Sequence, residues 1–176
     1  ERTLILACML FWSVLSALFF SRYVISSAEV VGPSMEPTLY DGQHCILHRW
    51  CYNIRAPRRG DIVGFHLPGD PGLTVKRVIA LPGETVRIHD GTVYVNGAPL
   101  REPYIPEEII THADLMDDRT FLISPDCYFV LGDNRNESAD SRQFGAVPRA
   151  YLIGRVQSGG GDLMRPELIH AALSVP

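Results

Sequence analysis

The chain has 176 residues, a formal net charge of −4 and 46% apolar residues. This length is sufficient for one membrane segment and one domain with its own core. The mildly acidic charge argues against a nucleic-acid-binding surface, so we predict no nucleic-acid partner. The 15 glycines and 13 prolines favour a turn-rich β domain over a helix bundle.

An apolar segment opens the chain. Residues 4–20 read LILACMLFWSVLSALFF, and with Tyr23, Val24 and Ile25 they approach the roughly 20 residues that span a bilayer. We therefore predict a transmembrane anchor over residues 1–25, with the lipid bilayer as a partner. A cleaved signal peptide is the alternative, since residues 26–28 read Ser-Ser-Ala. The apolar run is longer than a usual signal core, which favours an uncleaved anchor.

Residues 26–158 predict one β-rich domain. Runs rich in β-branched and aromatic residues predict strands over 29–31, 44–50, 62–67, 73–81, 127–131 and 151–157. Two alternating segments around Asp90-Gly91 predict a hairpin. Residues 101–126 are irregular and acidic, as expected of an insertion or a lid. Residues 159–176 form a C-terminal tail, either a short helix or loose chain.

Lys76 is the only lysine among 16 basic residues. Arginine stays protonated in proteins, whereas a buried lysine can lose its proton and act as a base. Strand alternation places Lys76 on one face with Thr74 and Val78, and Arg77 on the other. Desolvation on an apolar face would lower the pKa of the amine. Lys76 is therefore a candidate general base.

A candidate nucleophile lies just after the apolar segment. Ser34 sits between Pro33 and Pro37, whose rings favour a rigid extended turn rather than a helix. A serine hydroxyl needs a base to become a nucleophile, and no histidine has a suggestive neighbourhood. Histidine spacing indicates no metal site, and serine–lysine chemistry needs no cofactor. Taken alone, this segment is also compatible with a plain surface turn.

Several motifs occur together in the order found in type I signal peptidases, which this sequence closely resembles. These peptidases are membrane-anchored endopeptidases that use a serine–lysine dyad. The matching segments are Pro33–Leu39, Arg59–Asp61, Lys76–Glu84, Gly132–Arg135 and Ser138–Arg142. The resemblance covers roughly residues 4–157. It implies a mainly β, antiparallel-sheet catalytic domain of the type shared with self-cleaving repressors, behind one transmembrane helix.

The resemblance also implies residue roles. Ser34 would attack the scissile carbonyl, and Lys76 would take its proton and later activate the deacylating water. The implied supporting residues are Ser138 as a partner of the Lys76 amine, Asp140 and Arg142 as a structural pair, and Asp133 and Arg77 as further support.

The oxyanion hole departs from part of the family. The backbone N–H of Ser34 would be one donor, but some members carry a second donor, a serine, where this chain has Gly32. Loss of one such donor can cost about 3 kcal/mol in transition-state stabilisation. Val31 and Met35 are the predicted substrate-binding residues. An extended substrate should pair with residues 29–31, and Met35 should line one of the small pockets that select the substrate.

The implied activity is removal of signal peptides from exported preproteins, after small residues of the Ala-X-Ala type. The implied location is a bacterial-type inner (cytoplasmic) membrane, with a single-pass anchor and the catalytic domain on the outer, periplasmic or extracellular face. The main alternative is a specialised relative that matures one pilin or secreted partner. A self-cleaving repressor and an inactive peptide-binding domain are two more distant candidates. Pairing of Cys45 with Cys51 stays open.

Overall fold

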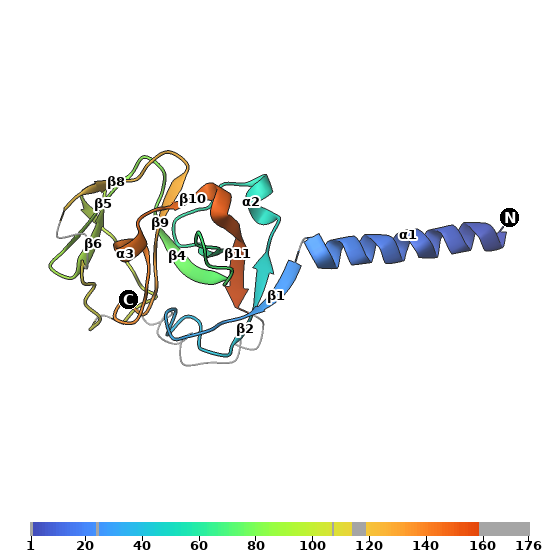
Figure 1. Ribbon diagram of the computed structural model, residues 1–176, viewed down its shortest axis with the longest axis horizontal. Helices are drawn as coiled ribbons and strands as arrows, with labels where there is room; N and C mark the ends of the chain where they lie inside the picture. The colour runs from blue at the N-terminus through green and yellow to red at the C-terminus, as the bar shows by residue number, and fades with distance from the viewer. Residues whose placement is uncertain (1, 24, 107, 114–118, 159–176) are drawn as a thin grey trace, which may run out of the picture.

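The N-terminal helix α1 (Arg2–Tyr23) projects from a β-rich domain (Figure 1). The computed structural model describes every residue except 1, 24, 107, 114–118 and 159–176, so the predicted tail lies outside the described residues. The apolar side chains of α1 from Leu4 to Leu18 are exposed. Within the described parts of the chain, no helix has the length and hydropathy that crossing a membrane requires.

The domain contains two antiparallel sheets. The larger has seven strands in the order β1-β2-β11-β3-β4-β9-β10, and the smaller has four in the order β7-β6-β5-β8. The larger sheet comprises β1 (Ile25–Glu29), β2 (His44–His48), β3 (Ile62–Phe65), β4 (Thr74–Ala80), β9 (Cys127–Leu131), β10 (Val147–Pro148) and β11 (Leu152–Ser158). The smaller comprises β5 (Thr85–His89), β6 (Thr92–Val95), β7 (Ala98–Pro99) and β8 (Phe121–Leu122). The prediction of a mainly β, antiparallel fold is confirmed.

Three short helical segments complete the fold. They are α2 (Cys51–Ile54), α3 (Ser141–Phe144) and the 3-10 helix η2 (Arg149–Tyr151). The predicted strand over residues 44–50 therefore ends at His48, and the chain turns into α2. The predicted strand over 62–67 likewise ends at Phe65, before a loop that leads to β4.

The first strand begins earlier than predicted. Residues 26–28, which resemble a cleavage site, lie inside β1, where Ala28 pairs with Cys45 of β2. The strand ends at Glu29, and Val30 continues the pairing through an N–H that donates to the Gln43 carbonyl at 2.9 Å. The prediction missed this because Ser and Ala are poor strand signals, whereas the β2 partner decides the outcome.

The predicted hairpin is confirmed as β5–β6. Val86 pairs with Val95 and Ile88 with Val93. The turn residues Asp90 and Gly91 have φ values of 46° and 77°, the left-handed region that this kind of tight turn requires. The buried valines and isoleucine of the hairpin pack with residues of β4 and β9 and join the two sheets in one core.

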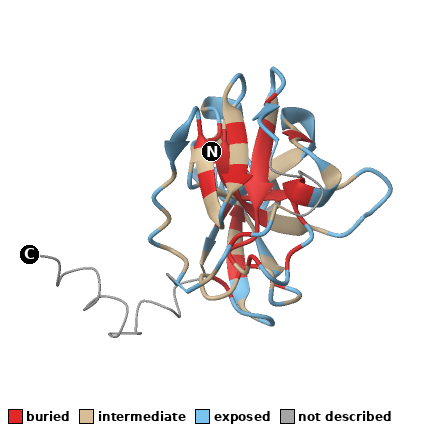
Figure 2. Cartoon of the chain, turned by 90° about the vertical axis from the view of Figure 1, so that its left-hand side faces the viewer, coloured by how far each residue is buried: buried red, intermediate tan, exposed pale blue. Residues whose placement is uncertain are grey.

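The core also fixes the segment that follows β1. Met35 and Leu39 are buried against Cys45 and Leu47 of β2 and Val156 of β11. Figure 2 shows buried residues concentrated in the central strands, with exposed residues on the loops. The Ser34 segment is therefore anchored by apolar side chains on a rigid sheet.

The cysteines are free thiols. Cys45 is buried, and Cys51 is half-buried at the start of α2. Cys45 and Cys51 therefore do not form a disulfide in this structure.

Candidate active site

The segment around Ser34 is held from both sides. Met35 and Leu39 bury their side chains in the core, and the Leu39 N–H donates to the Met35 carbonyl at 3.0 Å. The Ser34 carbonyl accepts from the N–H of Asn134 at 3.1 Å, which ties this segment to the loop after β9. The backbone of Ser34 is therefore positioned by two regions far apart in the sequence.

Ser34 and Lys76 meet at hydrogen-bonding distance. Lys76 Nζ lies 2.7 Å from Ser34 Oγ and 3.0 Å from the carbonyl oxygen of Val75. Strand β4 carries Lys76 to the Ser34 turn, and the lysine is only 4% exposed. The structure thus brings together the two residues that the sequence predicts as nucleophile and base.

Burial lowers the pKa of Lys76 from 10.5 to about 8. Removal of the amine from water disfavours its charged form, and Arg142 acts in the same direction. The carboxylates of Asp140 and Asp133 oppose the shift, because negative charge nearby stabilises the ammonium. Burial is the larger effect, so the neutral form of the Lys76 amine is far more populated near neutral pH than it is for an exposed lysine.

Ser138 lies next to the dyad without the predicted hydrogen bond. Its Oγ is buried and has no hydrogen-bond partner among the described residues. Lys76 donates to Ser34 and to the Val75 carbonyl instead. A buried hydroxyl without a partner is costly and is a common feature of functional sites.

The absence of a side chain at Gly132 lets the Ser138 loop approach the Ser34 segment closely. A Cβ at this position would lie 2.2 Å from Ser138 Oγ and 2.5 Å from the Ser34 carbonyl oxygen. Only a residue without a side chain fits between these two segments. The sequence shows Gly132 as part of a motif, but it does not show that the residue acts as a spacer.

The predicted pair of Asp140 and Arg142 is present. Two nitrogens of the Arg142 guanidinium each lie 2.8 Å from an Asp140 carboxylate oxygen, and both side chains are buried. Asp140 also accepts from the Gly132 N–H at 3.1 Å, and Arg142 donates to the Ser138 carbonyl at 3.3 Å. The pair therefore fixes both the spacer glycine and the Ser138 backbone.

Arg77 and Asp133 form a second buried pair. Arg77 Nε and Nη2 donate to the two Asp133 oxygens at 2.8 and 2.5 Å. Thr38 donates to Asp133 and accepts from Arg77, and the Arg77 guanidinium carbon lies 3.9 Å from the centre of the Tyr104 ring. Both acidic and basic groups are thus satisfied, and the end of the Ser34 segment is joined to β4 and to the loop after β9.

Sequence reasoning missed a third buried arginine. Arg135 is 1% exposed and forms an ion pair with Glu102, and it donates to Thr111 Oγ1 at 2.6 Å. Tyr104 donates to Glu102 at 2.6 Å. These contacts attach the described part of residues 101–113 to the loop that carries Ser138. Nothing in the local sequence pairs Arg135 with a glutamate so far back in the chain.

A groove of about 300 Å³ opens beside the dyad. Both predicted substrate-binding residues line it, since Val31 is 87% exposed at its wall and buried Met35 also contributes. The remaining lining residues are Glu29, Val30, Ser34, Leu67, Asp70, Leu73, Thr74, Val75, Lys76 and Ala139. The nucleophile therefore faces a channel between the end of β1 and the start of β4.

Gly32 adopts a φ of +84°, and its N–H donates to Asp41 Oδ1 at 2.7 Å. No heavy atom lies within 4 Å of a Cβ built at this position, so the glycine is there for its backbone conformation rather than for space. The Gly32 N–H is committed to Asp41. This position thus supplies neither a side-chain nor a free backbone oxyanion donor.

A groove in a mainly β domain, lined by a serine in contact with a buried lysine, is the arrangement expected of a serine hydrolase. The profile of the family described as "Signal peptidase, peptidase S26" matches residues 3–159. The chain therefore belongs to the signal peptidase family, peptidase S26, whose members are serine endopeptidases.

Relatives from several bacteria agree with this assignment. The chain is 38% identical over 160 residues to signal peptidase I of Leptolyngbya laminosa, covering 81% of this chain and 72% of that protein. It is 38% identical over 143 residues to signal peptidase I of Bacillus caldolyticus, covering 76% and 78%. A crystal structure of a signal peptidase I from Enterococcus faecalis matches with a TM-score of 0.50 and 36% identity, over 58% of this chain and 98% of that one.

Proposed function

We propose that this chain is a membrane-anchored endopeptidase that removes signal peptides from exported preproteins, after small residues of the Ala-X-Ala type, by means of a Ser34–Lys76 dyad. The observation that carries the proposal is the 2.7 Å contact between Ser34 Oγ and a buried Lys76 amine. Membership of the signal peptidase family supports the substrate class.

Acylation begins when neutral Lys76 accepts the Ser34 proton as Oγ attacks the scissile carbonyl. The backbone N–H of Ser34 is the proposed donor to the oxyanion that forms. When the tetrahedral intermediate collapses, protonated Lys76 gives its proton to the leaving amine. The products of this half-reaction are the ester of Ser34 and the mature chain with a new N-terminus.

Deacylation reuses the same base. Lys76, neutral again, takes a proton from water, and the resulting hydroxide attacks the Ser34 ester. Return of the proton to Ser34 Oγ releases the signal peptide with a free carboxyl end. Ser138, Asp140 and Arg142 act as positioning residues, because they contact or surround the loop beside the dyad rather than the reacting bond.

The groove supports selection of small residues. An extended peptide beside residues 29–31 would direct alternate side chains against the apolar residues Val31, Met35, Leu73 and Val75. A space of about 300 Å³, shared with the peptide backbone, admits small side chains more readily than aromatic ones.

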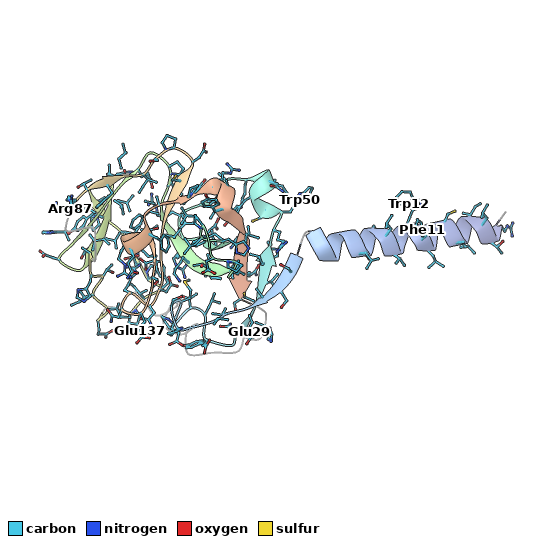
Figure 3. The ribbon with its side chains drawn as sticks, in the orientation of Figure 1. Phe11, Trp12, Glu29, Trp50, Arg87 and Glu137 are labelled. Atoms are coloured by element: carbon cyan, nitrogen blue, oxygen red, sulfur yellow. The ribbon has the colours of Figure 1, made fainter. Side chains whose placement is uncertain are left out.

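Helix α1 is the proposed single-pass anchor. Its large apolar side chains from Leu4 to Leu18 are exposed, and the helix projects away from the catalytic domain (Figure 3). Apolar side chains exposed along a helix are expected to be covered by lipid or by another protein. Membership of the signal peptidase family supports anchoring in the inner membrane with the groove on the outer face, where exported chains emerge.

Purified full-length protein in detergent should cleave a precursor with an Ala-X-Ala end at that site, as read by N-terminal sequencing of the product. The Ser34→Ala variant is the control and should give no product. A panel of unrelated secretory precursors separates a general enzyme, which cuts most of them, from a specialised one, which cuts a single partner. Failure to cut any precursor would overturn the proposal.

The pH profile of kcat/KM should follow the ionisation of Lys76. Because the base must be neutral, kcat/KM should rise about tenfold per pH unit below a pKa of about 8 and level off above it. Initial rates at low precursor concentration between about pH 6 and pH 10 measure this. A flat profile across that range would be incompatible with a lysine base.

A further inference from the structure

Gly132 is held on both sides of its backbone by buried charged side chains. Its N–H donates to Asp140 Oδ2 at 3.1 Å, and its carbonyl oxygen accepts from Arg135 Nε at 3.1 Å. Two residues further along the same loop, the Asn134 N–H donates to the carbonyl oxygen of Ser34 at 3.1 Å. The position of the Ser34 backbone therefore depends on where the side chains of Asp140 and Arg135 hold this loop.

Glu102 orients the guanidinium group of Arg135. Arg135 Nη1 donates to Glu102 Oε2 at 3.0 Å and Nη2 donates to Glu102 Oε1, which is the two-bond geometry in which arginine binds a carboxylate most strongly. Nη1 also donates to Thr111 Oγ1 at 2.6 Å. The Arg135 side chain is 0% exposed and that of Glu102 is 9% exposed. Because water does not reach Arg135, its contacts with Glu102 and Thr111 determine where Nε points.

The segment that carries Glu102 and Thr111 is attached at both ends to the β5–β6 hairpin. The Leu100 N–H donates to the Val93 carbonyl at 2.8 Å, and the Thr111 N–H donates to the Gly91 carbonyl at 3.1 Å. Val93 is buried in the core that the hairpin shares with β4 and β9. Figure 1 shows the smaller sheet at the end of the domain opposite helix α1. The hairpin is therefore a rigid base from which Glu102 and Thr111 contact the loop after β9.

The same segment also reaches the other side of Gly132. The His112 carbonyl accepts from Arg142 Nη1 at 3.3 Å, and Arg142 is the ion-pair partner of Asp140. The segment thus contacts both arginines that fix Gly132, Arg135 directly and Arg142 through Asp140. The described residues of this segment do not line the groove beside the dyad. Its contacts with the site are contacts with the loop after β9.

We propose that Glu102 is a positioning residue for the Ser34–Lys76 dyad and acts through Arg135 and Gly132. This inference rests on the proposed function, because it takes Ser34 as the nucleophile and Lys76 as its base. Glu102 keeps Arg135 Nε on the Gly132 carbonyl, and Gly132 in turn sets how closely the loop approaches Ser34. Without Glu102 the loop shifts, Ser34 Oγ moves away from Lys76 Nζ, and water enters beside the amine.

The first test is Glu102→Gln in the full chain in detergent. Glutamine has nearly the same size, but an amide N–H₂ replaces one acceptor oxygen, so both bonds from Arg135 cannot be kept. Misplacement of reacting groups by about 1 Å can cost about a hundredfold in rate, so we expect kcat for precursor cleavage to fall at least about tenfold. KM should stay within about twofold, because the residues that line the groove are unchanged.

The pH profile distinguishes positioning from a purely structural role. Burial lowers the pKa of Lys76 to about 8, and water that enters beside the amine would partly reverse this effect. In Glu102→Gln the pKa read from kcat/KM should therefore rise from about 8 towards the ordinary value of 10.5. A loss of stability alone reduces the amount of folded enzyme without moving this pKa. A wild-type pH profile in Glu102→Gln would overturn the proposal, whatever its kcat.

A double variant keeps the test informative if Glu102→Gln folds poorly. The single change leaves Arg135 as a buried cation without its carboxylate, which destabilises the fold. Glu102→Gln with Arg135→Met removes that charge, so thermal stability should partly recover. Because the Gly132 carbonyl still lacks its donor, kcat should stay at least about tenfold below wild type. Recovery of kcat together with stability would overturn the proposal.

The matched control is Arg55→Gln, which breaks an ion pair elsewhere in the domain. Arg55 Nη1 lies 2.8 Å from Asp61 Oδ2, and both side chains are largely buried. Among the described residues, neither partner lines the groove or contacts the loop after β9. Arg55→Gln should lower thermal stability while kcat stays within about twofold and the pH profile stays that of wild type.

The outcomes separate this inference from the proposed function. If wild type cleaves the precursor and Glu102→Gln matches it in kcat and pH profile, Glu102 is not a positioning residue and the proposed function stands. If wild type cleaves no precursor, both are overturned.

Discussion

Replacement of Lys76 by arginine or methionine should reduce kcat/KM for precursor cleavage by at least about a thousandfold. Arginine keeps the positive charge but does not lose its proton, so it cannot accept the proton of Ser34. Methionine fills a similar volume without any basic group. General-base catalysis alone typically contributes about 10²- to 10⁴-fold, and the Ser34 hydroxyl is a weak nucleophile without it.

Combination of the Lys76 and Ser34 changes tests whether the two residues act as a unit. Ser34→Ala should be as inactive as Lys76→Met, and the double variant should be no worse than either, because the second loss removes nothing further. Ser27→Ala, an exposed serine in β1, is the control and should keep wild-type activity.

Thermal unfolding of each variant shows whether inactivity reflects chemistry or misfolding. Lys76→Met should be at least as stable as wild type, since it removes the cost of burying an amine. Near-native cleavage by Lys76→Arg would exclude lysine as the base.

The two reacting residues could be predicted because their chemistry limits the choices. Lys76 is the only lysine, and it lies in a strand with apolar neighbours, which is where a lysine loses its charge. Ser34 lies between prolines in a segment that forms turns rather than a regular helix. The β5–β6 hairpin was equally predictable, since Asp90-Gly91 favours a tight turn between alternating segments.

The supporting contacts could not be predicted from local patterns. Arg135 meets Glu102 and Thr111 only because β9 brings its loop against the segment after β7. The use of the Gly32 N–H by Asp41 likewise depends on how the chain returns to β2. Such contacts depend on which segments meet in the folded chain. The periodicity of apolar residues predicts helices and strands, but it does not predict these meetings.

The start of β1 shows the same limit on a larger scale. Residues 26–28 resemble a cleavage site in the sequence, and their small side chains do not predict a strand. Their pairing with β2 nevertheless makes them part of a seven-stranded sheet. Edge strands of low intrinsic preference are determined by their partner rather than by their own composition.

Gly132→Ala should reduce kcat/KM at least about a hundredfold while the chain still folds. The added methyl would lie 2.2 Å from Ser138 Oγ, 2.5 Å from Ser138 Cβ and 2.5 Å from the Ser34 carbonyl oxygen. Gly132 does not adopt a left-handed φ, so the penalty is steric. Displacement of the nucleophile by about 1 Å can cost about a hundredfold in rate, and overpacking typically costs about 1–3 kcal/mol in stability.

Two further variants make the Gly132 result specific. Gly145→Ala is the control, because Gly145 has a φ of +82° and open space around it. It should lose stability through backbone strain yet keep kcat/KM within about twofold.

Adding Ser138→Gly to Gly132→Ala removes the clash with the side chain but not the clash with the Ser34 backbone. Stability should therefore partly recover while activity does not. Wild-type activity of Gly132→Ala alone would show that the two segments can separate without moving Ser34 from Lys76.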